Sequence, residues 1–88
     1  MAKLPKVYKI ERTRYRTGST SVQEGTLEEL VKAYSYTLEV GQSWQHEKGN
    51  KKINCNPKSV KTLVNNLNNA VNNSAANGYA GVTYRLVD

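Results

Sequence analysis

The fold is decided by one stretch of sequence, Asn56-Pro57-Lys58-Ser59-Val60-Lys61-Thr62-Leu63-Val64-Asn65-Asn66-Leu67-Asn68-Asn69-Ala70-Val71. Its apolar residues recur at the three- and four-residue spacing of one helix face, and Ser74 and Ala75 continue the pattern. Asn56-Pro57 predicts the start of the helix, because asparagine caps free N–H groups and proline is preset for the first helical position. Asn77-Gly78 predicts its end. We therefore predict a helix over residues 57–77.

A second helical pattern lies upstream. Thr26-Leu27-Glu28-Glu29 fits a capping box, in which each of the two outer side chains accepts a hydrogen bond from the backbone N–H of the other residue. Apolar and aromatic residues then follow at helical spacing, and Gly41 is a suitable stop. These features predict a helix over residues 26–40. Residues 36–40 also alternate as a strand would, but the continuing apolar stripe favours the helix.

Three further segments alternate between β-forming and polar residues and predict strands. Residues 6–24 carry two of them around the turn residues Thr17-Gly18-Ser19-Thr20, which is the pattern of a β-hairpin. Residues 81–87 carry the third. The order ββααβ predicts an α+β fold, with a three-stranded antiparallel sheet and two helices packed on one face. With 88 residues we expect a single domain, residues 1–88, in which 42–56 is a loop.

The charge is positive overall and unevenly distributed. The net charge is +6, with +5 in residues 1–16, −3 in residues 17–41 and +4 in residues 42–61. This distribution argues against an acidic mimic of nucleic acid, and it permits contact with phosphate or with an acidic protein surface. No apolar run approaches the ~20 residues that span a bilayer, and the basic N-terminus lacks the apolar segment of a signal peptide. We expect a cytoplasmic protein without a membrane partner.

The sequence offers little for catalysis or metal binding. His46 is the only histidine and Cys55 the only cysteine, and neither stands in a known catalytic or ligand spacing. The adjacent Glu28 and Glu29 are explained by the favourable effect of negative charge at a helix start. We therefore expect no catalytic residue, metal or cofactor, and a Cys55 thiol that is buried or idle. The protein is predicted not to be an enzyme.

The predicted loop is the first candidate binding region. Loops of this length are uncommon in compact domains and are often functional. An exposed tryptophan in it would be a typical hot spot, although a tryptophan that caps the core is the alternative. Lysines around the predicted helix start would favour an anion, because free N–H groups also point there, and solvated lysines are the alternative. The candidate partner-binding residues are Trp44, His46, Lys48, Lys51, Lys52, Lys58, Lys61, Asn65, Asn69 and Asn72.

The first strand is the second candidate region. Arg12, Arg14 and Arg16 occupy alternate positions, which places three guanidinium groups in one row, and Tyr15 lies close enough to stack on a base. The alternative is an edge strand that its charges protect against pairing with other chains. The candidate phosphate-binding residues are Arg12, Arg14, Arg16, Lys51, Lys52 and Lys58.

Six asparagines lie on the face of the predicted second helix opposite to its apolar stripe, at positions 65, 66, 68, 69, 72 and 73. Each costs roughly 0.6 kcal/mol of helix preference relative to alanine. An amide-rich helix face suits base edges in a major groove or a polar protein interface. The codon bias of an A+T-rich genome explains the asparagines equally well, and both interpretations stay open.

Residues 25–81 also contain several strings that can be compared with known sequences. They are Gly25-Thr-Leu-Glu-Glu-Leu-Val31, Ser35-Tyr-Thr-Leu-Glu-Val-Gly41, Trp44-Gln-His-Glu-Lys-Gly-Asn-Lys-Lys-Ile-Asn54, Asn56-Pro-Lys58, Leu67-Asn-Asn-Ala70 and Asn77-Gly-Tyr79. These strings resemble small, mostly uncharacterised accessory proteins of tailed bacteriophages. The resemblance implies a protein made in the cytoplasm of an infected bacterium, where small phage proteins bind and redirect host machinery. It brings no catalytic residues.

Three functional hypotheses follow. The first is a small phage-type protein that binds, and inhibits or redirects, a host cytoplasmic protein or complex. The alternative is a nucleic-acid-binding protein that uses its basic strand and loop. If about four to six of those side chains contact duplex phosphates, log affinity should fall against log salt with a slope of roughly −4 to −5. The third is a minor structural protein of the virion, and self-association is left open.

Overall fold

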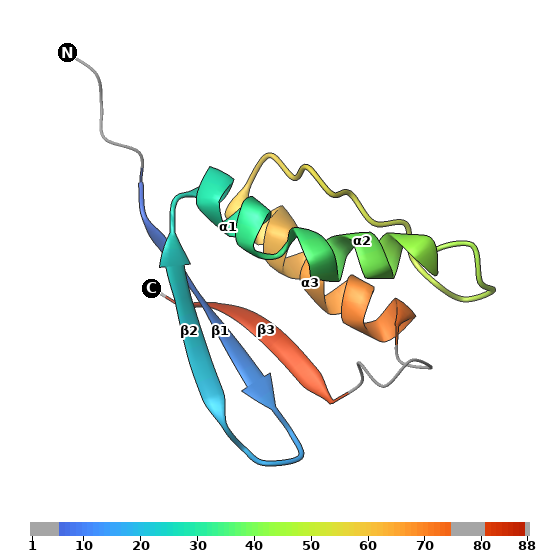
Figure 1. Ribbon diagram of the computed structural model, residues 1–88, viewed down its shortest axis with the longest axis horizontal. Helices are drawn as coiled ribbons and strands as arrows, with labels where there is room; N and C mark the ends of the chain where they lie inside the picture. Colours follow the sequence, from blue (N-terminus) through green and yellow to red (C-terminus); the bar gives the residue numbers. More distant parts are fainter. Residues whose placement is uncertain (1–5, 75–80, 88) are drawn as a thin grey trace.

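The computed structural model describes residues 6–74 and 81–87, and it places a three-stranded sheet against a layer of helices (Figure 1). The strands are β1 (Tyr8–Arg14), β2 (Thr20–Gly25) and β3 (Val82–Val87). The helices are α1 (Leu27–Ala33), α2 (Ser35–Ser43) and α3 (Val60–Asn73). The predicted α+β class and the ββααβ order are confirmed, except that the first helical segment is divided in two.

β1 is the central strand, and it pairs antiparallel with β2 on one side and with β3 on the other. The predicted hairpin is therefore confirmed, with Gly18 in its turn at a φ of +69°. Residues that lie directly opposite each other share a face of the sheet. The face against the helices carries Ile10, Arg12 and Arg14 of β1 and, opposite them, Leu86, Tyr84 and Val82 of β3. The other face is largely polar, and on it Arg85 forms a 3.1 Å salt bridge with Glu11.

The predicted capping box at the start of α1 is present. The Thr26 hydroxyl accepts from the N–H of Glu29 (3.2 Å), and the Glu29 carboxylate accepts from the N–H of Thr26 (2.9 Å). The single helix predicted over residues 26–40 is wrong in extent, because it breaks at Tyr34 and then continues to Ser43. Residues 36–40 belong to α2, so the strand alternative is excluded.

Gly41 does not end the helix as predicted. It lies buried within α2, where α2 packs on α3. A Cβ atom at this position would lie 2.3 Å from the Cβ and 2.4 Å from the Cα of Ala70. The glycine that was interpreted as a helix stop instead permits close helix packing, because only glycine allows the backbones of α2 and α3 to approach this closely.

The predicted start of α3 at residue 57 is also wrong. The helix begins at Val60, because Ser59 is extended and its hydroxyl accepts from the N–H of Thr62 (3.2 Å). Ser59 is as good a cap as Asn56, and it is the cap that the structure uses. The described helix ends at Asn73, and the predicted end at Asn77-Gly78 lies outside the described residues.

The core forms between the sheet and the helices. It contains the predicted stripe of α3 together with residues from β1, α1, α2 and β3, namely Ile10, Leu30, Leu38, Leu63, Leu67, Ala70, Val71 and Tyr84. One core residue comes from the connection between α2 and α3, which spans residues 44–59 rather than 42–56. That residue is Ile53, which is 2% exposed and anchors the connection to the core.

Two asparagines of α3 hold this connection through their side-chain amides. Asn73 is buried; its Oδ1 accepts from the N–H of Lys51 (3.0 Å), and its Nδ2 donates to the carbonyls of Lys51 (2.7 Å) and Gly41 (3.2 Å). Asn66 is also buried and accepts from the N–H of Asn54 (3.2 Å). Both were assigned to an exposed helix face, and this assignment is wrong because the connection covers that side of α3. The amides replace partners that the extended backbone lacks.

Asn68 has a similar role at the edge of the sheet. Its Oδ1 accepts from the N–H of Tyr84 (2.8 Å), and its Nδ2 donates to the Tyr84 carbonyl (3.0 Å). Tyr84 lies in the middle of β3, so this amide occupies the edge of β3 that faces away from β1. At the opposite edge of the sheet, β2 is exposed from Thr20 to Glu24.

Replacing Asn73 with alanine should destabilise the fold by about 2–3 kcal/mol, because it leaves the buried Gly41 carbonyl and the partly buried backbone groups of Lys51 without their partner. Asn72 is adjacent and exposed, so Asn72→Ala is the matched control. It should stabilise the protein by up to roughly 0.6 kcal/mol through helix preference alone. Urea unfolding followed by circular dichroism measures both, and equal effects would contradict the role given to Asn73.

Candidate functional site

A cavity of about 520 Å³ opens between the hairpin and the helices. Its lining residues come from β1 and the hairpin turn, from the junction of α1 with α2, from α3 and from the start of β3. We call this cavity the arginine pocket. Its lining consists of Arg12, Arg14, Arg16, Thr17, Tyr34, Thr37, Val71, Gly81, Val82 and Tyr84.

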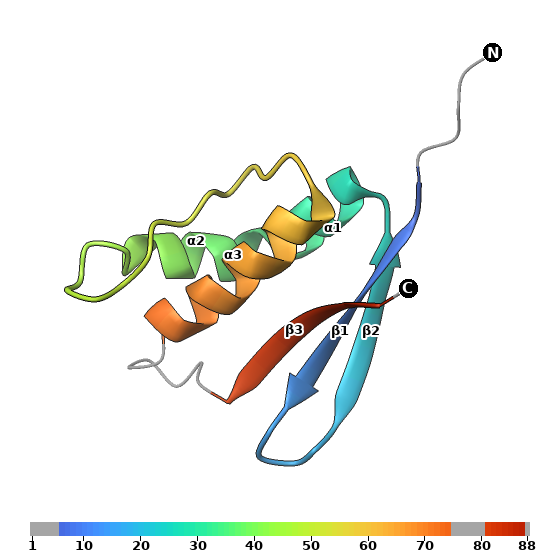
Figure 2. The same ribbon diagram turned by 180° about the vertical axis from the view of Figure 1, so that it is seen from behind.

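The three predicted arginines form one side of the pocket, and we refer to them as the arginine row. Arg12 and Arg14 alternate along β1 on the face that meets the helices, and Arg16 follows in the turn. Ile10 is buried beneath the helices, whereas Arg14 and Arg16 are exposed. The hairpin therefore extends beyond the helical layer (Figure 2). The N–H of Tyr15 donates to the Gly81 carbonyl (2.8 Å), which ties this end of the hairpin to the start of β3.

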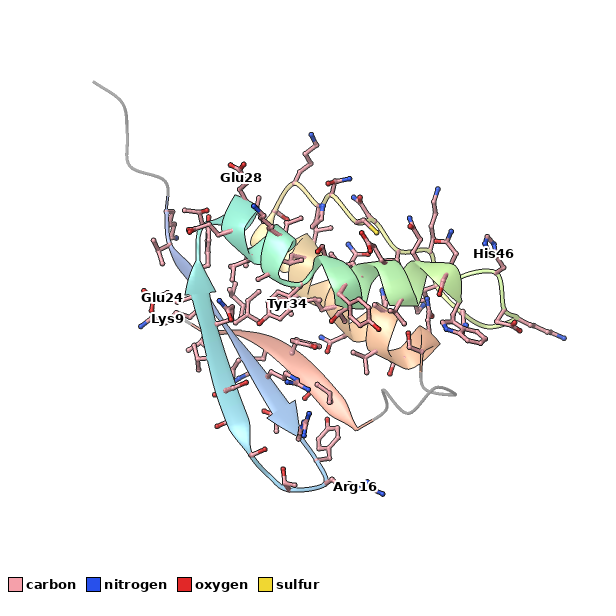
Figure 3. The ribbon with its side chains drawn as sticks, in the orientation of Figure 1. Lys9, Arg16, Glu24, Glu28, Tyr34 and His46 are labelled. Atoms are coloured by element: carbon pink, nitrogen blue, oxygen red, sulfur yellow. The ribbon has the colours of Figure 1, made fainter. Side chains whose placement is uncertain are left out.

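Two tyrosines also line the pocket, Tyr84 beside Arg12 on the same face of the sheet and Tyr34 from the helical layer. Tyr34 lies at the break between α1 and α2, on the side of the helices that faces the strands (Figure 3). Its ring meets that of Tyr84 edge to face, with the centroids 5.5 Å apart and the planes at 80°. Burial, together with the neighbouring Tyr84, raises the pKa of Tyr34 to about 12, against the opposing effect of Arg12. The Tyr34 hydroxyl thus stays protonated at neutral pH and can donate a hydrogen bond.

The arginine row carries positive charge without a carboxylate partner among the described residues. The ion pair formed within residues 6–74 and 81–87 joins Glu11 to Arg85 on the other face of the sheet. The Nε of Arg12 is buried and has no hydrogen-bond acceptor in this part of the chain. Buried donors without acceptors are rare and costly, so Arg12 is held at the pocket with one of its donors unpaired.

A second, smaller hollow lies on the other side of the arginine row. Its volume is about 210 Å³, and hydroxyl side chains from the turn and from β2 share its lining with Arg12 and Arg14. These hydroxyl residues are Ser19, Thr20 and Ser21. Arg12 and Arg14 therefore form a ridge between a large hollow with aromatic walls and a small one with hydroxyl groups.

The candidate residues of the loop lie elsewhere. The connection from α2 to α3 runs along the side of the helices away from the hairpin (Figures 1 and 2), and His46 projects at its far end (Figure 3). His46, Lys48, Lys51, Lys52, Lys58 and Lys61 are exposed, whereas Trp44 is half-buried. The structure thus does not bring the lysines to the arginine row. The predicted helix start moves from residue 57 to Val60, and the anion site at the helix start, with Lys58 and Lys61 beside it, stays a prediction.

The remaining asparagines of the candidate set stay on the outer face of α3. Asn65 and Asn72 are exposed, and Asn69 is half-buried. Their spacing places them on one helix face together with Lys61. The other three asparagines, Asn66, Asn68 and Asn73, form hydrogen bonds with the backbone of other segments. Half of the asparagines of α3 therefore have a structural role.

Sequence reasoning did not find the wall of the pocket that faces the arginine row. Tyr34 lies at the junction of α1 and α2, Thr37 in α2 and Val71 in α3, and no local pattern connects them with β1. Val82 and Tyr84 were easier to predict from the sequence, because antiparallel pairing of the last strand with the first places them next to Arg14 and Arg12. To predict the lining residues of β3, the register of the sheet must be known. To predict those of the helical layer, the packing of the helices on the sheet must be known.

The described parts of the chain contain no cluster of three or more histidine, cysteine or acidic side chains placed to hold a metal ion. No helix within them has the length and apolar character that crossing a membrane requires. Comparisons of the chain with protein-family models, with curated proteins and with solved structures found no match. The interpretation of the site therefore rests on its own geometry.

Replacing Tyr34 with phenylalanine should make the protein less sensitive to alkali. The pKa of Tyr34 is raised from 10.0 to about 12 in the folded state, so its contribution to stability is complete below pH 10.0 and is lost as the pH rises through about 12. Urea unfolding at several pH values across this range measures the difference from wild type. Tyr15→Phe, at a side chain that is 68% exposed, is the control and should follow the wild-type curve. Parallel curves for Tyr34→Phe and wild type would contradict the prediction.

Proposed function

We propose that this chain is a nucleic-acid-binding protein whose arginine row contacts backbone phosphates. The observation that carries the proposal is that three arginines line one open cavity without a carboxylate partner among the described residues. Guanidinium groups remain protonated and match phosphate oxygens with paired hydrogen bonds. The site is therefore suited to holding an anion rather than to moving protons.

Two features favour nucleic acid over an acidic protein surface. The pocket is concave, whereas a protein surface that buries enough area for stable binding covers a broad and nearly flat patch. Its walls also combine cationic groups with aromatic rings and hydroxyl groups, and these are the groups that contact phosphates, sugars and bases. Following the phage resemblance of residues 25–81, we place this activity in the cytoplasm of an infected bacterium.

Binding to a host protein is the second candidate, and it stays a prediction for the α2–α3 connection. That connection is held in one shape by Asn66 and Asn73, and it exposes His46 and Lys48 at its tip. Its expected anchor, Trp44, is half-buried, and the Trp44 carbonyl accepts from Asn50 Nδ2 (2.7 Å). A partly covered aromatic ring offers less to a partner than an exposed one, so this surface ranks below the arginine pocket.

Fluorescence anisotropy with labelled oligonucleotides at several salt concentrations tests the proposed function. If the arginine row supplies three phosphate contacts, the slope of log affinity against log salt should be about −2 for a single strand and about −3 for a duplex. A slope of roughly −4 to −5 would indicate that loop lysines also bind. No binding at low salt, or binding without salt dependence, would rule out the proposal.

A further inference from the structure

We propose that the arginine pocket receives one nucleotide of a single-stranded nucleic acid, with the phosphate at the arginine row and the base against the opposite wall. This inference rests on the proposed function and specifies the form of nucleic acid that the protein selects. It follows from the size of the pocket, from the difference between its two sides, and from the second hollow beside it.

The size of the pocket favours a flexible strand. A volume of about 520 Å³ lies within the range of about 300–1,000 Å³ that is typical of sites for small organic ligands. A single nucleotide is a ligand of this kind. A duplex, in contrast, is a stiff rod that keeps its bases stacked inside, so it can contact the rim of the pocket but cannot place a base within it.

The two sides of the pocket differ in the way that the two ends of a nucleotide differ. One side presents the arginine row, which suits the phosphate. The other includes Tyr34 and Thr37, which are half-buried, and Val71, which is buried. Flat aromatic and aliphatic surfaces suit the face of a base, and hydroxyl groups suit its edge.

The smaller hollow is suited to binding the next phosphate along the same nucleic-acid strand. Alternate residues of a strand are about 6.6–6.8 Å apart, which is similar to the distance between successive phosphates of one nucleic-acid strand. Arg12 and Arg14 therefore match two successive phosphates. Beyond them, Ser19 and Ser21 line the hollow of about 210 Å³, and hydroxyl groups are common phosphate contacts. The strand thus crosses the row from one hollow to the other, and a short oligomer should bind more tightly than a mononucleotide.

Anisotropy measurements on the full chain test this inference with four probes at one salt concentration. The probes are an oligothymidylate of about ten nucleotides, a duplex of the same length, thymidine monophosphate as a competitor, and the same backbone with abasic residues. The oligothymidylate should bind at least about tenfold more tightly than the duplex. Loss of the bases should weaken binding by about five- to hundredfold, as expected when stacking on the wall is removed.

A variant that fills the pocket gives a second readout. Thr37→Phe adds a ring to the wall and keeps every charge, so it should weaken oligothymidylate binding by at least about tenfold and leave duplex binding unchanged. Ser43→Phe adds the same ring at an exposed position of α2 outside the pocket and should bind as wild type does. The abasic probe uses the unaltered chain, so the inference stays testable if Thr37→Phe does not fold.

The outcomes separate the inference from the proposed function. Binding to none of the probes would overturn both. Equal or tighter binding of the duplex, with the expected salt slope, would overturn the inference and keep nucleic-acid binding. Abasic and base-bearing strands of equal affinity would also overturn it, since the base would then have no place in the site.

Discussion

Reversing the charge at Arg14 and Arg16 together should weaken binding to nucleic acid by more than about a hundredfold at about 0.1 M salt. Both guanidinium groups are exposed at the arginine pocket, so the fold does not depend on them. A hydrogen bond to a charged group contributes about 1.5–3 kcal/mol, and each factor of ten in affinity corresponds to about 1.4 kcal/mol. Two lost contacts therefore account for the effect, and repulsion between the new carboxylates and phosphate adds to it.

The matched control for this double variant is Lys48→Glu with Lys52→Glu. It changes the net charge by the same amount, but both lysines lie on the α2–α3 connection away from the hairpin. The control should lose no more than about fivefold, because screening limits the reach of exposed charges to about 10 Å. Anisotropy at a fixed salt concentration measures both. Equal losses in the two double variants would mean that overall charge, and not the arginine pocket, governs binding.

Replacing Gly41 with alanine should destabilise the fold by more than about 3 kcal/mol. In an exposed helix the same change stabilises by about 1 kcal/mol, so the expected sign is opposite to that of helix preference. The reason is the close contact of α2 with α3, where a new Cβ would lie 2.3 Å from the Ala70 Cβ and 2.4 Å from its Cα. Relief requires the two helices to separate, which opens the core. The loss is a large part of the roughly 5–15 kcal/mol that stabilises a typical domain.

Urea unfolding of Gly41→Ala, Ala70→Gly and the double variant tests this contact. Ala70→Gly alone should cost about 2 kcal/mol through helix preference and a lost buried methyl group. In the double variant the Cβ–Cβ contact is absent. Its loss of stability should therefore be at least about 1 kcal/mol smaller than the sum of the losses measured for the two single variants. The rescue should be partial, because the contact with the Ala70 Cα remains. A Gly41→Ala protein as stable as wild type would contradict this account of the packing.

The parts of the fold that were predicted correctly depend on neighbours in sequence. The capping box at Thr26, the hairpin turn at Gly18 and the apolar stripe of α3 are each complete within a few residues, so the pattern and the physical cause coincide. The start of α3 was misplaced because Asn56 and Ser59 are both good caps, and local preference does not choose between them. Tertiary contacts of the preceding connection decide such cases.

The errors have a common physical origin in contacts between distant segments. Gly41 carries the same local signal as a helix stop, and only its contact with Ala70 gives it another meaning. Asn66 and Asn73 look exposed on a helix taken alone, because their partners belong to a connection that has no period of its own. Ile53 is a single apolar residue among polar ones, and its burial follows from the path of that connection.

The candidate site divides in the same way. The arginine row follows from alternation along one strand, and it was predicted from three residues. The wall that turns this row into a pocket depends on the break at Tyr34 and on the crossing of α3 over β3, and neither feature has a local signature. The loop lysines were grouped with the arginines by charge alone, and charge carries no information about position.

The amide of Asn68 also determines how many neighbours the sheet can accept. It occupies the backbone groups of Tyr84 in the middle of β3, so a regular ladder cannot continue from that edge, whereas β2 remains exposed. A sheet with one available edge can pair with only one further strand. Strand addition between copies of this chain would therefore stop at a closed two-fold pair, because a fibre requires two open edges on every subunit.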